Sequence, residues 1–157
     1  MSVQPKTFHA AFYKGDRPGL TGLYNPIVRW WDHGKFSHCE AVFSDGWSAS
    51  SSFMDHGVRF KRIDYDPHKW EFLVLPQDKE LSARDWFQVH DGEPYDVLGN
   101  FRFLADFLSN SPNKWFCNEA LLAALGAHDP WRFGPNGAYS LLYTMYEHLQ
   151  PDYLRIR

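Results

Sequence analysis

The sequence predicts a single α+β domain over residues 1–157, with an antiparallel sheet packed by helices. Strand-like runs rich in aromatic and β-branched residues fill the first half of the chain, with short Gly- and Asp-containing turns between them. After Pro76 the apolar residues instead recur with the period of about 3.6 that marks a helix. Strands that precede helices, rather than alternate with them, are typical of α+β proteins.

Each predicted strand rests on a short alternating or apolar run that turn residues bound. The predicted strands cover 7–13, 37–43, 47–52, 57–63 and 70–75, and the fuller apolar run of the last one favours an interior strand. Between the second and third strands, "SDG" is a hairpin composition. If Asp45 and Gly46 form a two-residue loop, Glu40 lies opposite Ser51.

Helix-start and helix-stop residues frame the other segments. Asn25 as a cap and Pro26 at the first position predict a short helix that stops at Gly34. Helical periodicity predicts four further helices, within 81–92, 95–110, 117–126 and 138–149. We expect "GPNG" (134–137) to break the chain before the last of these.

Composition and charge exclude several classes of partner. The 157 residues are 44% hydrophobic and 18% aromatic, which is enough to fill a core without metal or disulfide cross-links. A net charge of −3 and the lack of Lys/Arg clusters argue against nucleic acid. No apolar run approaches the ~20 residues that span a bilayer. With two cysteines and no signal-peptide pattern, we expect free thiols and a cytoplasmic location.

The stretch "FSHCEAVFSDGWSASS" (36–51) carries an ionisable pair inside a predicted strand. Strand alternation places His38 and Glu40 on one face, and Cys39 with Ala41 on the opposite, core-like face. Buried imidazole and carboxylate groups cost free energy unless partners compensate them. The alternatives for this pair are a structural histidine and a salt bridge from Glu40 to an arginine.

Cys117 begins the predicted helix of "KWFCNEALLAALG". Unpaired backbone N–H groups and the helix dipole favour a thiolate there, so Cys117 is a candidate nucleophile. A nucleophilic cysteine needs a base, and the base needs a polar group that orients it; His38 and Glu40 are the candidates, with Ser51 as a second choice for the orienting group. The alternative is that Cys117 is a small buried hydrophobe. We expect Cys39 to be an inert core thiol.

These two segments, with "PYDVLGN" between them, resemble the circularly permuted branch of the papain-like superfamily over roughly residues 34–126. That branch includes NlpC-type peptidases, YiiX-like proteins and lecithin:retinol acyltransferase. The resemblance implies a permuted papain-like fold with Cys117 as nucleophile, His38 as base and Glu40 as orienting residue. It also implies that Tyr95 lines the cleft, and we take Trp115 and Ser51 as further substrate-binding candidates.

Relatives often carry the third polar residue on the strand after the histidine, which keeps Ser48, Ser50 and Ser51 open for that role. Compact single-domain members with this arrangement of strands and helices also resemble proteins encoded by bacteriophages.

The expected activity is hydrolysis of an amide bond, in a peptide or a peptidoglycan stem, through a thioester acyl-enzyme and without a cofactor or metal. Acyl transfer and ester cleavage on the same triad are alternatives, as is an inactive binding or structural module. Zinc-dependent deaminases share the H-x-E pattern of His38 and Glu40, but the chain lacks their P-C-x-x-C segment. The sequence names neither the acyl group, the leaving group nor the oligomeric state.

Overall fold

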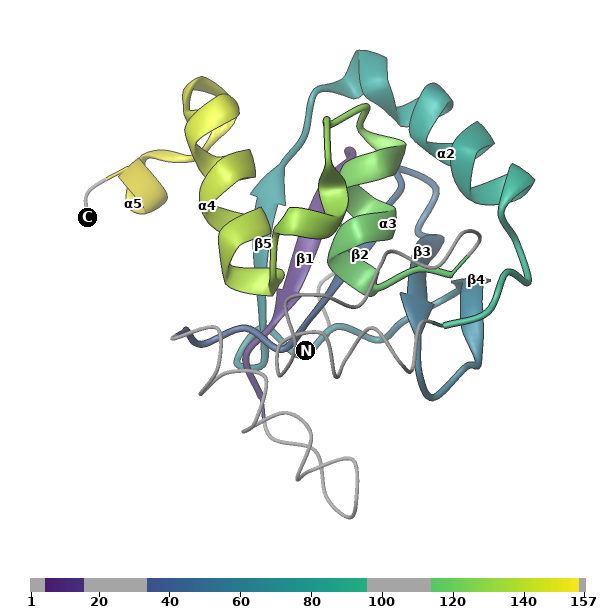
Figure 1. Ribbon diagram of the computed structural model, residues 1–157. Coiled ribbons are helices and arrows are strands. Elements are labelled where there is room, and N and C mark those ends of the chain that lie inside the picture. Colours follow the sequence, from purple (N-terminus) through teal and green to yellow (C-terminus); the bar gives the residue numbers. More distant parts are fainter. Residues whose placement is uncertain (1–4, 16–33, 96–113, 156–157) are drawn as a thin grey trace.

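The computed structural model describes residues 5–15, 34–95 and 114–155 (Figure 1). The short helix expected at 25–34 and the helix expected at 95–110 lie outside the described residues, apart from Gly34 and Tyr95.

A five-stranded antiparallel sheet forms the centre of the molecule (Figure 1). Its strands, in the order β4-β3-β2-β1-β5, are β1 (His9–Tyr13), β2 (His38–Val42), β3 (Ser48–Ser52), β4 (Gly57–Lys61) and β5 (Trp70–Val74). The predicted α+β class and its antiparallel sheet are thereby confirmed.

β5 is an edge strand of this sheet, so the expectation of an interior strand was wrong. Its apolar run has another cause, because both of its faces are covered: Leu73 joins one hydrophobic cluster, and Trp70 the other. The side chain of Gln150 shields the open edge, since its amide accepts from the N–H of Val74 and donates to the C=O of Val74, each at 2.9 Å.

Helices cover one face of the sheet (Figure 1). They are α2 (Glu80–Val89), α3 (Cys117–Ala124), α4 (Pro135–Met145) and the short α5 (Asp152–Arg155), with 3-10 turns at Gln77–Lys79, Pro130–Arg132 and Glu147–Leu149. "GPNG" starts α4 rather than breaking the chain before it, because Gly134 caps the helix and Pro135 supplies the fixed φ of a first helical residue. None of the helices within the described segments has the length and hydrophobicity to cross a membrane.

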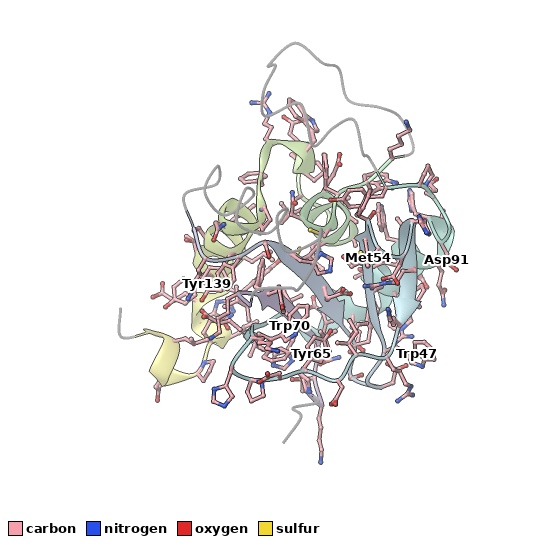
Figure 2. The ribbon with its side chains drawn as sticks, turned by 90° about the horizontal axis from the view of Figure 1, so that it is seen from below. Trp47, Met54, Tyr65, Trp70, Asp91 and Tyr139 are labelled. Atoms are coloured by element: carbon pink, nitrogen blue, oxygen red, sulfur yellow. The ribbon has the colours of Figure 1, made fainter. Side chains whose placement is uncertain are left out.

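Two hydrophobic clusters bury the two faces of the sheet. The larger one, between the sheet and the helices, includes Cys39 from β2 and Cys117 from α3. On the opposite face Tyr65 and Trp70 lie side by side, with ring centroids 5.0 Å apart (Figure 2). Polar side chains that enter either face therefore leave water and need partners inside the protein.

The hairpin between β2 and β3 has a loop of residues 44–46, one residue longer than expected. Gly46 adopts φ 83°, and its N–H donates to the carbonyl of Phe43 at 3.0 Å, the geometry of a three-residue hairpin loop with glycine in the left-handed region. The ladder pairs Ala41 with Ala49. The predicted register was therefore wrong by one residue, and Ser51 does not lie opposite Glu40.

Candidate active site

Local contacts fix the start of α3 at Cys117. Phe116 is extended, and its N–H donates to Oε2 of Glu119 at 3.4 Å, so the chain turns into the helix at the next residue. Oγ of Ser51 donates to the carbonyl of Trp115 at 2.6 Å, which ties the entering segment to β3. Cys117 thus lies in the first turn of α3, where backbone N–H groups have no helical acceptor.

His38 interacts with both Glu40 and Cys117. α3 packs on β2, and Cys117 and His38 are the first residues of these two elements. His38 and Cys117 shift each other's pKa, through charge and through hydrogen bonding. His38 Nε2 donates to Oε1 of Glu40 at 2.7 Å, the contact expected from their shared strand face, and this leaves Nδ1 as the ring nitrogen for the thiol.

These contacts set the charges of Cys117 and His38. A hydrogen bond from the Cys39 thiol and the positive charge of His38 together lower the pKa of Cys117 well below its usual range, against the opposing effect of burial. Burial lowers the pKa of His38, but the charge and hydrogen bond of the Cys117 thiolate outweigh it and, with Glu40, raise that pKa to about 9. At neutral pH the two side chains therefore form a thiolate–imidazolium pair.

Cys39 is a second thiol at the site. Its side chain is fully buried in the cluster beneath α3, and burial together with the nearby Cys117 raises its pKa well above the usual value. Cys39 therefore remains protonated, and hydrogen bonding from its thiol and its backbone N–H lowers the pKa of Cys117. Sequence analysis identified Cys39 as a core residue but missed this contact.

Arg59, on β4, also belongs to the site, although sequence analysis named it only as an unspecified arginine. Its Nη1 donates to Oε2 of Glu40 and its Nη2 donates to Oε1, both at 2.6 Å. Burial raises the pKa of Glu40, but the positive charge of Arg59 and these hydrogen bonds outweigh it and hold the pKa at about 2. Glu40 therefore contacts both His38 and an arginine, the two partners that the sequence analysis gave as alternatives.

The three serines left open as the orienting residue hydrogen-bond elsewhere. Ser48 bonds the hydroxyl of Tyr65 at 2.7 Å, Ser50 donates to the carbonyl of Cys39 at 2.7 Å, and Ser51 bonds the backbone ahead of α3. Among the candidates for this role, Glu40 is the one in contact with the His38 ring.

The candidate substrate-binding aromatics border the start of α3. Tyr95 is buried, and its ring meets Phe116 and Phe53 edge-on, at centroid distances of 5.7 and 5.9 Å. Phe53 is half exposed, so this aromatic row leads from solvent to the residue before the thiol. The indole of Trp115 instead packs on Trp86 and donates to a carboxylate of Glu93.

No three or more His, Cys, Asp or Glu side chains in the described segments are arranged to hold a metal ion. Comparisons with models of protein families, with curated proteins and with solved structures found no match. The fold and the site geometry therefore carry the functional argument, and the resemblance to permuted papain-like proteins stays a prediction.

Proposed function

We propose that the protein is a cysteine-dependent hydrolase that cleaves an amide bond, in a peptide or a peptidoglycan stem, through a thioester acyl-enzyme. One observation carries the proposal: His38 hydrogen-bonds Glu40 at 2.7 Å, and it shares charge with Cys117 at the start of α3, so that the pKa of the thiol is lowered and that of the imidazole is raised. A nucleophile, a base and an orienting carboxylate in this order are the parts that acyl transfer to a thiol requires. The peptide or peptidoglycan substrate rests on the sequence resemblance.

The first half-reaction forms the acyl-enzyme. The Cys117 thiolate attacks the substrate carbonyl carbon, and the N–H groups in the first turn of α3 are placed to stabilise the oxyanion. The His38 imidazolium gives its proton to the leaving nitrogen, the C–N bond breaks, and the amine departs. Cys117 then holds the acyl group as a thioester, and His38 is neutral.

The second half-reaction releases the acid. Neutral His38 takes a proton from water, the resulting hydroxide attacks the thioester carbonyl, and the C–S bond breaks. The electron pair returns to Cys117 as thiolate, and His38 is again protonated beside it. Throughout, Glu40 holds the ring by accepting from Nε2. An amine or alcohol in place of water would give acyl transfer, and an ester in place of the amide would give esterase activity.

An inactive binding module is the competing proposal. The low pKa of Cys117 and the protonated state of His38 favour chemistry over simple binding, because a structural thiol has no need to ionise. A cytoplasmic location in a bacterial or phage-infected cell, with no nucleic-acid partner, completes the proposal and rests on composition and resemblance alone.

Denaturing mass spectrometry of the protein after incubation with activated acyl esters and with muropeptides tests the mechanism. We expect an acyl adduct on Cys117 that hydroxylamine removes, with release of the amine or alcohol product. Cys117→Ala should abolish both adduct and product, whereas Cys39→Ala keeps the nucleophile and should still form the adduct, more slowly, because the thiol that lowers the Cys117 pKa is gone. Turnover retained in Cys117→Ala would refute the cysteine mechanism. Adduct formation from esters without amide cleavage would favour the esterase or transferase alternative.

A further inference from the structure

The Glu40 carboxylate is ionised in a place where a carboxylate is normally unstable. Its side chain is 1% exposed, and it lies on the sheet beside His38. Desolvation favours the protonated form of a buried carboxyl group. A protonated Glu40 would bring no negative charge to His38, and the imidazolium would lose one of the two anions that stabilise it. The thiolate–imidazolium pair therefore depends on whatever keeps Glu40 ionised.

Arg59 has the geometry for this task. Its side chain is 14% exposed, and two of its nitrogens meet the two carboxylate oxygens of Glu40 in a fork. Oε1 of Glu40 is shared, because it accepts from Arg59 at 2.6 Å and from His38 at 2.7 Å. The fork fixes the plane of the carboxylate and so the direction in which Oε1 faces the imidazole. A lysine ammonium, as a point charge, would not fix that plane.

Arg59 is itself anchored. Its Nε donates to Oδ2 of Asp55 at 2.8 Å, and Nζ of Lys61 lies 3.1 Å from Oδ1 of the same carboxylate. The Asp55 side chain is 26% exposed and that of Lys61 is 53% exposed, so the network reaches solvent there. Charges thus alternate in sign along a path from the buried thiolate to the surface.

The other groups around Glu40 and His38 do not substitute for Arg59. The Tyr65 hydroxyl is buried and bonded to Ser48, the Cys39 thiol is protonated, and the Trp70 ring lies 6.3 Å from the His38 ring. Within the described part of the chain, Arg59 is the only cation besides His38 that hydrogen-bonds Glu40.

We propose that Arg59 is a positioning residue that acts through Glu40 and sets the pH range over which Cys117 and His38 exist as an ion pair. Its contribution to catalysis rests on the proposed function. Its effect on the ion pair does not, because that effect can be measured without a substrate.

Arg59→Met is the main test. With no cation beside it, Glu40 takes up a proton at higher pH, the His38 pKa falls, and the Cys117 thiolate loses its partner. We expect the thiolate titration, followed by ultraviolet absorbance, to move up by at least about one pH unit, so that iodoacetamide alkylates Cys117 roughly 10-fold more slowly at mildly acidic pH. The thiolate titration of Arg59→Lys should lie between those of the wild-type protein and Arg59→Met. Arg84→Met is the matched control, since Arg84 pairs with Asp45 at the opposite end of β2 and should leave the titration unchanged.

A double-mutant cycle separates this role from a general structural one. If Arg59 acts through Glu40, Arg59→Met should leave the thiolate and His38 titrations of a Glu40→Gln protein within about 0.3 pH units. A comparable change in both backgrounds, or no change in either, would overturn the proposal. Should Arg59→Met fail to fold, Arg59→Lys and Asp55→Asn carry the same test, because both keep a cation beside Glu40 but loosen its position.

The two proposals can fail separately. Loss of the low thiolate titration in Arg59→Met, in a protein that cleaves no substrate, would support the positioning role and count against the hydrolase. Hydrolysis that keeps its full pH range in Arg59→Met would support the hydrolase and count against the positioning role of Arg59.

Discussion

Replacement of Cys117 by serine should lower the pKa of His38, so that the imidazole becomes neutral near neutral pH. The His38 pKa rises from its ordinary 6.5 to about 9 chiefly because of the charge and the hydrogen bond of the Cys117 thiolate, with Glu40 as the smaller contributor and burial in opposition. The difference between those two pKa values corresponds to about 3 kcal/mol. A serine hydroxyl is neutral at every accessible pH, so the main part of that free energy disappears with the thiolate.

The expected His38 pKa in Cys117→Ser is below about 7, because burial then opposes Glu40 alone. NMR titration of the imidazole protons measures it directly, in the variant and in the wild-type protein. Arg84→Met is the matched control: it removes a charged side chain that pairs with Asp45 and does not contact the thiolate, so the His38 pKa should stay near the wild-type value. An unchanged His38 pKa in Cys117→Ser would show that Glu40, and not the thiolate, holds the imidazolium.

Three further predictions follow from the described contacts. Iodoacetamide near neutral pH should modify Cys117 well before Cys39, and equal labelling in the folded protein would contradict the assigned thiol charges. The pKa of Glu40 is lowered from 4.5 to about 2, so its stabilising contribution is complete above 4.5 and is lost as the pH falls through 2. Glu40→Gln should therefore lower the unfolding free energy in urea by about 3 kcal/mol at neutral pH, with the difference shrinking toward pH ~2; a pH-independent difference would refute this. Gly57→Ala should cost more than about 2 kcal/mol, because a Cβ there would lie 2.1 Å from the carbonyl oxygen of Glu93 at φ 152°; a cost below about 0.5 kcal/mol would contradict the close approach.

Local signals were sufficient to find the elements that carry the site. Cys117 follows an extended residue and precedes an apolar helical run, so the start of α3 was predictable at the residue itself. The alternation of β2 likewise placed His38 with Glu40 and placed Cys39 in the core cluster. Both inferences use spacings of a few residues, over which backbone geometry leaves little freedom.

Contacts that depend on register were not predictable in the same way. One additional residue in the hairpin loop, at Gly46, moved Ser51 out of the row that contains Glu40. The sequence did not identify Arg59 as the arginine that pairs with Glu40, for the same reason. Arg59 lies on β4, 19 positions along the chain, and reaches Glu40 across β3. A one-residue slip changes which side chains share a row, and composition alone does not detect it.

The charges beneath the thiol need a reason other than stability. Desolvating Glu40 and Arg59 costs several kcal/mol for each ion, and their attraction offsets this only with close geometry and filled hydrogen-bond positions. An apolar pair of similar size in the same place would keep the sheet buried without that cost, as Val42, Tyr65 and Trp70 do on the same face. What an apolar pair would not supply is a permanent negative charge 2.7 Å from the ring nitrogen of His38. The buried ion pair is therefore best explained by the state that it imposes on His38, and through His38 on the Cys117 sulfur.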